Sequence, residues 1–127
     1  MTFNIEQARN AMVEQQVRPW NVVDLQVLET LNSIPRELFV PEAYQKLAFT
    51  DTALPIGQDQ WTLKPVIEGR LLQALKIQAN DEVLVVGTGS AFLTACMAQM
   101  ARAVNSIDIH AEFKKKKKTK LKSLELN

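Results

Sequence analysis

The chain of 127 residues is 46% hydrophobic and 23% charged, which is the composition of a globular domain with one modest core. It has no apolar run of about 18 residues, so we expect no membrane span. Its N-terminal stretch lacks the basic start and apolar segment of a secretory signal. Its single cysteine, Cys96, cannot form a disulfide within the chain. These features predict a cytoplasmic protein.

The net charge of +1 is unevenly distributed. Residues 114–127 contain seven lysines and one glutamate, a net charge of +6, which leaves −5 on residues 1–113. Such a run can bind nucleic acid or an anionic membrane surface, or it can form a solvated helix face. Only Phe113 supplies an aromatic ring beside it, and consecutive lysines repel one another on every side of a helix. We therefore favour the solvated face.

The N-terminal half alternates helical patterns with proline breaks. Apolar spacing of three or four residues predicts helices over residues 4–17, 22–34, 41–47 and 65–76. Pro19 and Pro35 end the first two of these helices. Residues 50–60, which contain Pro55 and Gly57, are predicted to form an ordered loop.

The pattern changes after residue 78. The continuous apolar strand Val83–Val86 is typical of a parallel strand that is buried on both faces. Ser90 is a suitable N-cap for the helix that follows. The later predicted elements are a helix over 91–102, a strand over 103–109 and a lysine-rich helix over 112–124.

A glycine-rich turn and an acid follow the two predicted strands. Gly87 and Gly89 allow a tight turn and close approach to a ligand. Asp108 lies 21 residues after Gly87, the spacing of one strand–helix–strand unit, and can accept both hydrogen bonds of a ribose diol. The sequence has no GxxxxGK[ST] motif, and Phe92 occupies the third glycine position of the dinucleotide pattern. The remaining pattern, G-x-G-x-small, is close to the S-adenosylmethionine loop of methyltransferases; a plain strand-to-helix turn is the alternative.

Several stretches, taken in order, resemble the protein-L-isoaspartate O-methyltransferase family. They are MVEQQVRPW, VLETLNSIPRELFVPEAY, LAFTDTALPIGQDQ, and VLVVGTGSAFLTA with VNSIDI, between about Arg9 and Asn127. The resemblance implies an α/β fold: a helical extension followed by the first strand–helix–strand–helix of a Rossmann-like class I methyltransferase sheet, incomplete here. Residues 1–78 would form the helical region with a covering loop. Residues 79–127 would form the N-terminal half of the S-adenosylmethionine-binding domain.

The resemblance also implies a function in protein repair. S-adenosylmethionine would donate a methyl group to the free α-carboxyl of L-isoaspartyl residues in damaged proteins or peptides. That carboxylate is already ionised at neutral pH, so alignment rather than a general base would drive the reaction. By position, the methionine end of the cofactor would be lined by Gly87, Thr88, Gly89 and Ser90, and its ribose would be bound by Asp108. The substrate loop would contribute Ile56, Gly57, Gln60, Trp61 and Thr62.

The sequence departs from the family pattern in four ways. Val85 replaces the acid two residues before the first glycine, and Ala91 replaces the third glycine, a change that is mild if this residue is helical with negative φ. Leu63 occupies the position of a serine that lies near the reacting carboxylate, so no catalytic residue is assigned. Finally, only the first two strands of the family's sheet are present, which predicts a truncated chain that self-associates through an unpaired sheet edge.

Two alternative functions therefore stand beside methyl transfer. One is a non-catalytic fragment of the family with weak or no cofactor binding. The other is a nucleic-acid or membrane-surface binder that uses its basic end.

The remaining conspicuous side chains have simpler interpretations. His110 is the single histidine and predicts a surface or hydrogen-bonded residue rather than a metal site. Cys96 is expected to be a buried, inert thiol. Trp20 and Trp61 could each stack on a substrate or cofactor. We expect Trp20 to pack against the core instead, whereas both interpretations stay open for Trp61.

Overall fold

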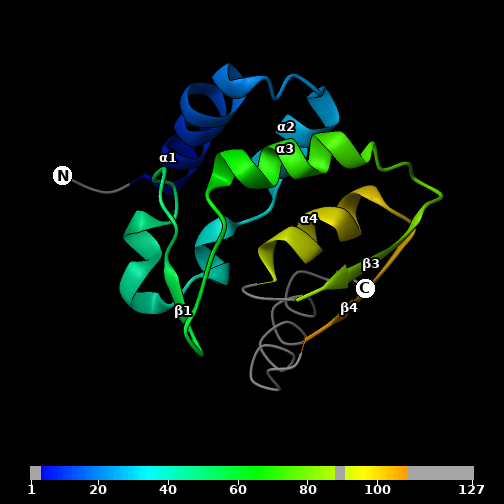
Figure 1. Cartoon of the computed structure of the whole chain (residues 1–127). Coiled ribbons are helices and arrows are strands. Elements are labelled where there is room, and N and C mark those ends of the chain that lie inside the picture. The colour runs from blue at the N-terminus through cyan, green and yellow to red at the C-terminus, as the bar shows by residue number, and fades with distance from the viewer. Residues whose placement is uncertain (1–3, 88–90, 109–127) are drawn as a thin grey trace.

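The computed structural model describes residues 4–87 and 91–108 (Figure 1). The α-helices are α1 (Ile5–Ala11), α2 (Leu25–Ser33), α3 (Pro65–Leu75) and α4 (Phe92–Met100). A π-helical segment, η1 (Met12–Val17), and three short 3₁₀ segments, η2 (Arg18–Trp20), η3 (Arg36–Phe39) and η4 (Glu42–Leu47), lie between them. The strands are β1 (Pro55–Gly57), β2 (Gln60–Trp61), β3 (Glu82–Val86) and β4 (Ala103–Ile107).

The helix boundaries follow from local capping. The Asn4 side chain accepts a hydrogen bond from the Gln7 amide before α1, and the Asp24 carboxylate accepts from the Gln26 and Val27 amides of α2. Pro65 is the first residue of α3, and Lys76 ends that helix with φ +50°. The predicted helices over 22–34 and 65–76 are confirmed. The predicted helix over 4–17 instead changes from α to π geometry at Met12, and the one over 41–47 is a 3₁₀ segment.

One core joins the N-terminal helices to α4. α3 approaches η1 closely because it carries Gly69, where a Cβ atom would lie 2.8 Å from Val17 Cγ1. Trp20 is 62% exposed, so the expectation that it packs in the core is wrong. The largest buried apolar side chains include Met12, Val13, Val17, Val22, Val27, Leu31, Leu72, Phe92 and Cys96.

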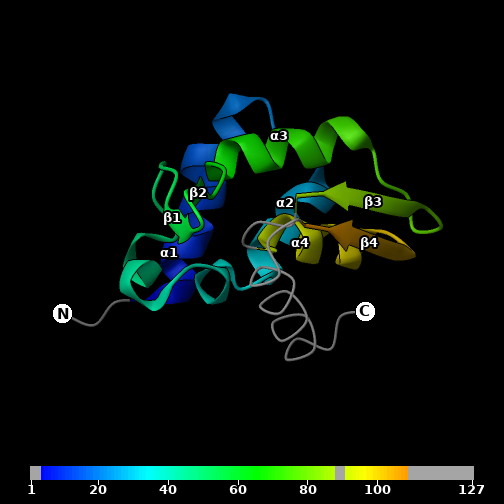
Figure 2. The same ribbon diagram turned by 60° about the horizontal axis from the view of Figure 1, so that its bottom comes forward.

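β3 and β4 form a parallel pair, with Glu82 opposite Ala103 and Val86 opposite Ile107. α4 connects the two strands and covers one face of the pair (Figure 2). Leu84 and Val86 point to the opposite face and are 64% and 74% exposed. The prediction of a strand buried on both faces is therefore wrong here, because no described element covers the second face.

Candidate functional site

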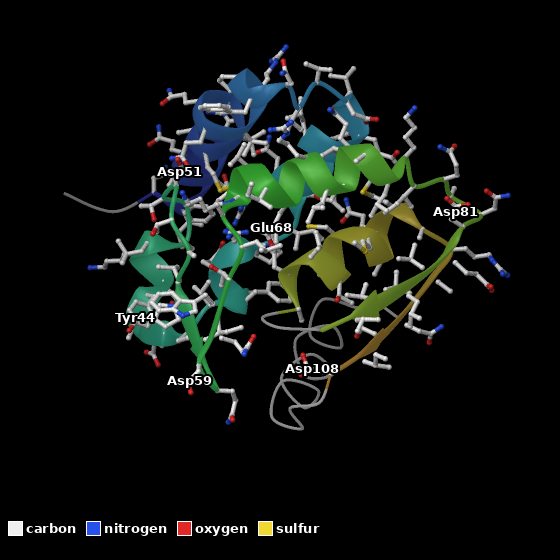
Figure 3. All side chains as sticks on the ribbon, viewed as in Figure 1. Tyr44, Asp51, Asp59, Glu68, Asp81 and Asp108 are labelled. Carbon is white, nitrogen blue, oxygen red and sulfur yellow. The ribbon has the colours of Figure 1, made fainter. Side chains whose placement is uncertain are left out.

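The turn after β3 and the acid after β4 lie at the same end of the strand pair. The Gly87 amide donates a hydrogen bond to the Ile107 carbonyl oxygen at 2.7 Å, and Asp108 follows Ile107 directly. Figure 3 shows Asp108 at this end and Asp81 at the opposite end of the strands. The spacing between Gly87 and Asp108 thus predicted their proximity correctly.

The backbone at Gly87 leaves room for a ligand. Gly87 has φ +85°, which glycine adopts without steric cost, and a Cβ atom built there would meet nothing within 4 Å. Thr88, Gly89 and Ser90, which complete the predicted cofactor loop, lie outside the described residues. The open glycine backbone and the neighbouring acid fit a ligand with a ribose group.

Ala91 is the residue immediately before α4, and it has φ +73°. The condition under which the replacement of glycine by Ala91 would be mild, a helical residue with negative φ, is therefore not met. The prediction of Ser90 as the N-cap is wrong, because Ala91 is the residue that caps this helix. A left-handed conformation brings a Cβ atom close to the following carbonyl and costs about 1–2 kcal/mol relative to glycine. Ala91 is also buried, so a strained residue lies in the core at the start of α4.

The segment predicted as a loop over residues 50–60 contains a β-hairpin. β1 pairs antiparallel with β2, and the two residues between them, Gln58 and Asp59, both have positive φ. Gly57, with φ +95°, precedes this tight turn. The sequence did not predict this hairpin for two reasons. Its turn residues are not glycine although they adopt left-handed conformations, and its strands are very short. Figures 1 and 2 show the carboxyl ends of β3 and β4 directed toward the side of the molecule that carries the hairpin.

Paired hydrogen bonds close the base of the hairpin. The Leu54 amide donates to Thr62 Oγ1 at 2.8 Å, and the Thr62 amide donates to the Leu54 carbonyl at 2.8 Å. Thr62 is buried, so its hydroxyl stabilises the fold. Its predicted contact with a substrate stays a prediction.

The other predicted substrate-loop residues divide between the interior and the surface. Ile56 is buried in the hairpin, while Gln60 is exposed and Trp61 is 62% exposed. The Leu63 side chain is also exposed, although its carbonyl is bonded inside the protein. Trp61 is therefore exposed and Thr62 buried, and the contact of each with a substrate stays a prediction.

A buried ion pair lies beneath this region, and the sequence analysis did not anticipate it. Arg36 is 2% exposed, pairs with Glu68 of α3, and donates to the carbonyls of Ala48 (2.7 Å) and Leu63 (3.0 Å). Its Cζ lies 4.8 Å from the centre of the Phe92 ring. The signal was present in α3: Glu68 falls on the stripe of Pro65 and Leu72, where an apolar residue is expected.

Burial governs the ionisable groups around this pair. It raises the pKa of Glu68 above its ordinary value, and the positive charge of Arg36 opposes that rise. Burial also raises the pKa of the Cys96 thiol strongly, and the nearby Glu68 raises it further. The prediction that Cys96 is buried is confirmed, and the raised pKa disfavours the reactive thiolate.

The part of the chain that the structure describes contains no set of metal ligands. Residues 4–87 and 91–108 contain no group of three or more His, Cys, Asp or Glu side chains placed to hold an ion. His110 lies outside those residues.

The model of the Protein-L-isoaspartate(D-aspartate) O-methyltransferase (PCMT) family matches residues 7–127. The chain belongs to this family. It is 36% identical over 122 residues to a protein-L-isoaspartate O-methyltransferase of Petrotoga mobilis, covering 96% of this chain and 57% of the relative. It is 39% identical over 107 residues to protein-L-isoaspartate O-methyltransferase 2 of Anaeromyxobacter sp., covering 84% of this chain and 44% of that protein. The chain thus spans about half the length of the curated relatives that it matches.

Solved structures confirm the fold. The chain superposes with a TM-score of 0.73 and 18% identity on a Plasmodium falciparum protein assigned as a protein-L-isoaspartate O-methyltransferase, in complex with S-adenosyl-L-homocysteine. That alignment covers 94% of this chain and 59% of the other. A second protein-L-isoaspartate O-methyltransferase gives a TM-score of 0.75 at 16% identity over 96% of this chain and 39% of its own. The fold is therefore that of class I methyltransferases, with a small, incomplete sheet in the described residues.

Proposed function

We propose that this chain acts in S-adenosylmethionine-dependent methyl transfer to isoaspartyl carboxyl groups of damaged proteins or peptides. The observation that carries the proposal is the hydrogen bond from Gly87 to Ile107, which brings the glycine turn beside Asp108 at the strand ends. Membership of the family supports the reaction type, and the open backbone at Gly87 supports the cofactor.

Each element of the site has a separate task in this proposal. The sulfonium of the cofactor supplies an activated methyl group when it is bound. Asp108 would accept hydrogen bonds from the ribose hydroxyls, and the turn at Gly87 would allow close backbone approach. The β1–β2 hairpin would cover the reacting centre and exclude water. Because the acceptor carboxylate is already ionised, the protein needs to hold donor and acceptor in line rather than move a proton.

The first experiment is calorimetric titration of the chain with S-adenosylhomocysteine. We expect binding by the wild type, loss of binding by Asp108→Ala, and unchanged affinity in Asp81→Ala, which removes an acid at the other end of the same strands (Figure 3). Circular dichroism establishes that each protein is folded. A folded wild-type chain that binds no S-adenosylhomocysteine would reject cofactor binding by these residues and favour the non-catalytic fragment.

The methyl acceptor requires its own test. We expect transfer of a labelled methyl group to a peptide with an isoaspartyl residue, and none to the matched aspartyl peptide. Leu63→Ser introduces a hydroxyl at an exposed side chain, so it should leave stability nearly unchanged and increase transfer. If the two peptides are methylated equally, isoaspartyl specificity is wrong even though methyl transfer is right.

The sheet also suggests that the chain associates with a second copy of itself. The apolar strands β3 and β4 pair only with each other among the described residues, and strand edges of this kind associate readily. We therefore propose self-association, which sedimentation velocity at increasing protein concentration would detect. A sedimentation coefficient that is independent of concentration and equal to the monomer value would reject it.

We expect the protein to act in the cytoplasm without a nucleic-acid partner. Within residues 4–87 and 91–108, no helix has the length and apolar character needed to cross a membrane. Cell fractionation would test whether the protein is found in the cytoplasm. Retention on nucleic acid that disappears with added salt would instead support the basic-end alternative.

A further inference from the structure

Arg36 contacts the hairpin segment at both of its ends. Its Nε donates to the Ala48 carbonyl at 2.7 Å, and its Nη2 donates to the Leu63 carbonyl at 3.0 Å. Residues 49–62, which include β1 and β2, lie between these two carbonyls. A single guanidinium group therefore holds the beginning and the end of the segment that covers the candidate site.

The same guanidinium group lies against the start of α4. Arg36 Cζ is 4.8 Å from the centre of the Phe92 ring, and Phe39 packs edge-on against that ring at 5.9 Å between centres. Phe92 is the first residue of α4, and its buried neighbour Ala91 marks the end of the glycine-rich segment. Arg36 thus lies between the hairpin and the helix that follows the glycine turn.

Glu68 fixes the orientation of Arg36 from α3. Both side chains are buried, and Glu68 pairs with Nη1 while Nε and Nη2 serve the two carbonyls. Guanidinium donors lie in one rigid plane, so these three contacts define the angle of the group. A lysine would keep the positive charge but could not make the same set of bonds.

We propose that Arg36 is a positioning residue that holds the β1–β2 hairpin in register with the start of α4. It thereby sets the distance between a methyl acceptor beneath the hairpin and a donor at the glycine turn. The consequence for methyl transfer rests on the proposed function, but the coupling of the two segments does not.

Amide hydrogen exchange measured by NMR tests this coupling. The Leu54 and Thr62 amides report the base of the hairpin, and the Leu31 amide of α2 reports the core. In Arg36→Lys we expect exchange at Leu54 and Thr62 to accelerate roughly tenfold to a hundredfold relative to Leu31, because a charged hydrogen bond is lost. The matched control Glu68→Gln removes the negative charge but keeps a side-chain oxygen that can accept from Nη1, so Arg36 should stay oriented toward both carbonyls. Exchange at all three amides should then change by similar factors.

Two results would overturn the proposal. In Arg36→Lys, exchange at Leu54 and Thr62 could stay at the wild-type rate, or it could accelerate by the same factor as at Leu31. If Arg36→Lys does not fold, the wild type decides: Leu54 and Thr62 should be protected within about tenfold of Leu31, whereas an unanchored two-stranded hairpin would fray far faster.

S-adenosylhomocysteine separates the positioning role from a purely structural one. We expect it to slow exchange at Thr62 in the wild type and to lose this effect in Arg36→Lys, even at saturating concentration. Equal slowing in both proteins would reject coupling between the two segments. If the wild type does not bind S-adenosylhomocysteine, the proposed function fails while the exchange rates still decide the role of Arg36.

Discussion

The N-terminal helices and the β3–β4 strand pair bury the same kinds of residue to very different extents. Leu31 and Val27 of α2 are buried, whereas Leu84 and Val86 of β3 are mostly exposed. The difference lies in the partners: α2 is packed against α3, η1 and α4, while the strand pair is covered by α4 on one face. An apolar sequence therefore indicates a buried residue only where another element covers it.

The largest expected effect compares leucine truncations in the two regions. Leu31→Ala should lower the free energy of unfolding by about 2–5 kcal/mol, because it leaves a cavity in the core. Leu84→Ala should lower it by less than about 1 kcal/mol, because that side chain is 64% exposed. Urea unfolding followed by circular dichroism measures both. Similar losses for the two variants would show that the outer face of β3 is covered in solution.

A methyl group at Gly69 should reveal how tightly the helical region is packed. The new Cβ would lie 2.8 Å from Val17 Cγ1, so Gly69→Ala should destabilise the protein by about 1–3 kcal/mol despite the better helix propensity of alanine. Arg70→Ala, at the exposed next position of α3, is the control and should change stability by no more than about 0.5 kcal/mol. A stabilised Gly69→Ala protein would mean that η1 can move away from α3.

Replacing alanine by glycine should change the stability in opposite directions at two positions, one just before α4 and one inside it. Ala91→Gly should stabilise the protein by about 1 kcal/mol, because the left-handed φ of +73° suits glycine. Ala95→Gly, inside the helix, should destabilise it by about 1 kcal/mol. Thermal unfolding of the two variants tests this contrast. Destabilisation by both would show that residue 91 is helical in solution.

The smallest expected effect is the change of stability with pH. It is small because burial raises the pKa of Glu68 while the positive charge of Arg36 lowers it. Burial holds the folded pKa of Glu68 above its ordinary value of 4.5, so the native state binds this proton more tightly than the unfolded state does. The stabilisation is complete below about pH 4.5 and is lost as pH rises through the folded pKa. The stability of the wild type relative to Glu68→Gln should therefore fall between pH 4 and pH 8 in urea titrations. A relative stability that rises over this range would mean that Arg36 dominates.

The candidate site was only partly predictable from sequence. The spacing of Gly87 and Asp108 placed them at one sheet end, because parallel strands joined by a helix end at the same edge. The hairpin was missed, because its turn uses Gln58 and Asp59 in left-handed conformations that favour other residues. The Arg36–Glu68 pair was also missed, because the partners are 32 residues apart and their contact depends on how α3 packs.

The sequence by itself determined the family, the strand–helix–strand order of β3, α4 and β4, and the helical character of α2, α3 and α4. Caps, prolines and apolar spacing act over a few residues, so they can be read without the fold. Only the tertiary structure decided which face of β3 is covered, that Thr62 points inward, and that one buried arginine joins the hairpin to α4. Those outcomes depend on contacts between distant segments, and no local pattern encodes the direction in which two packed elements meet.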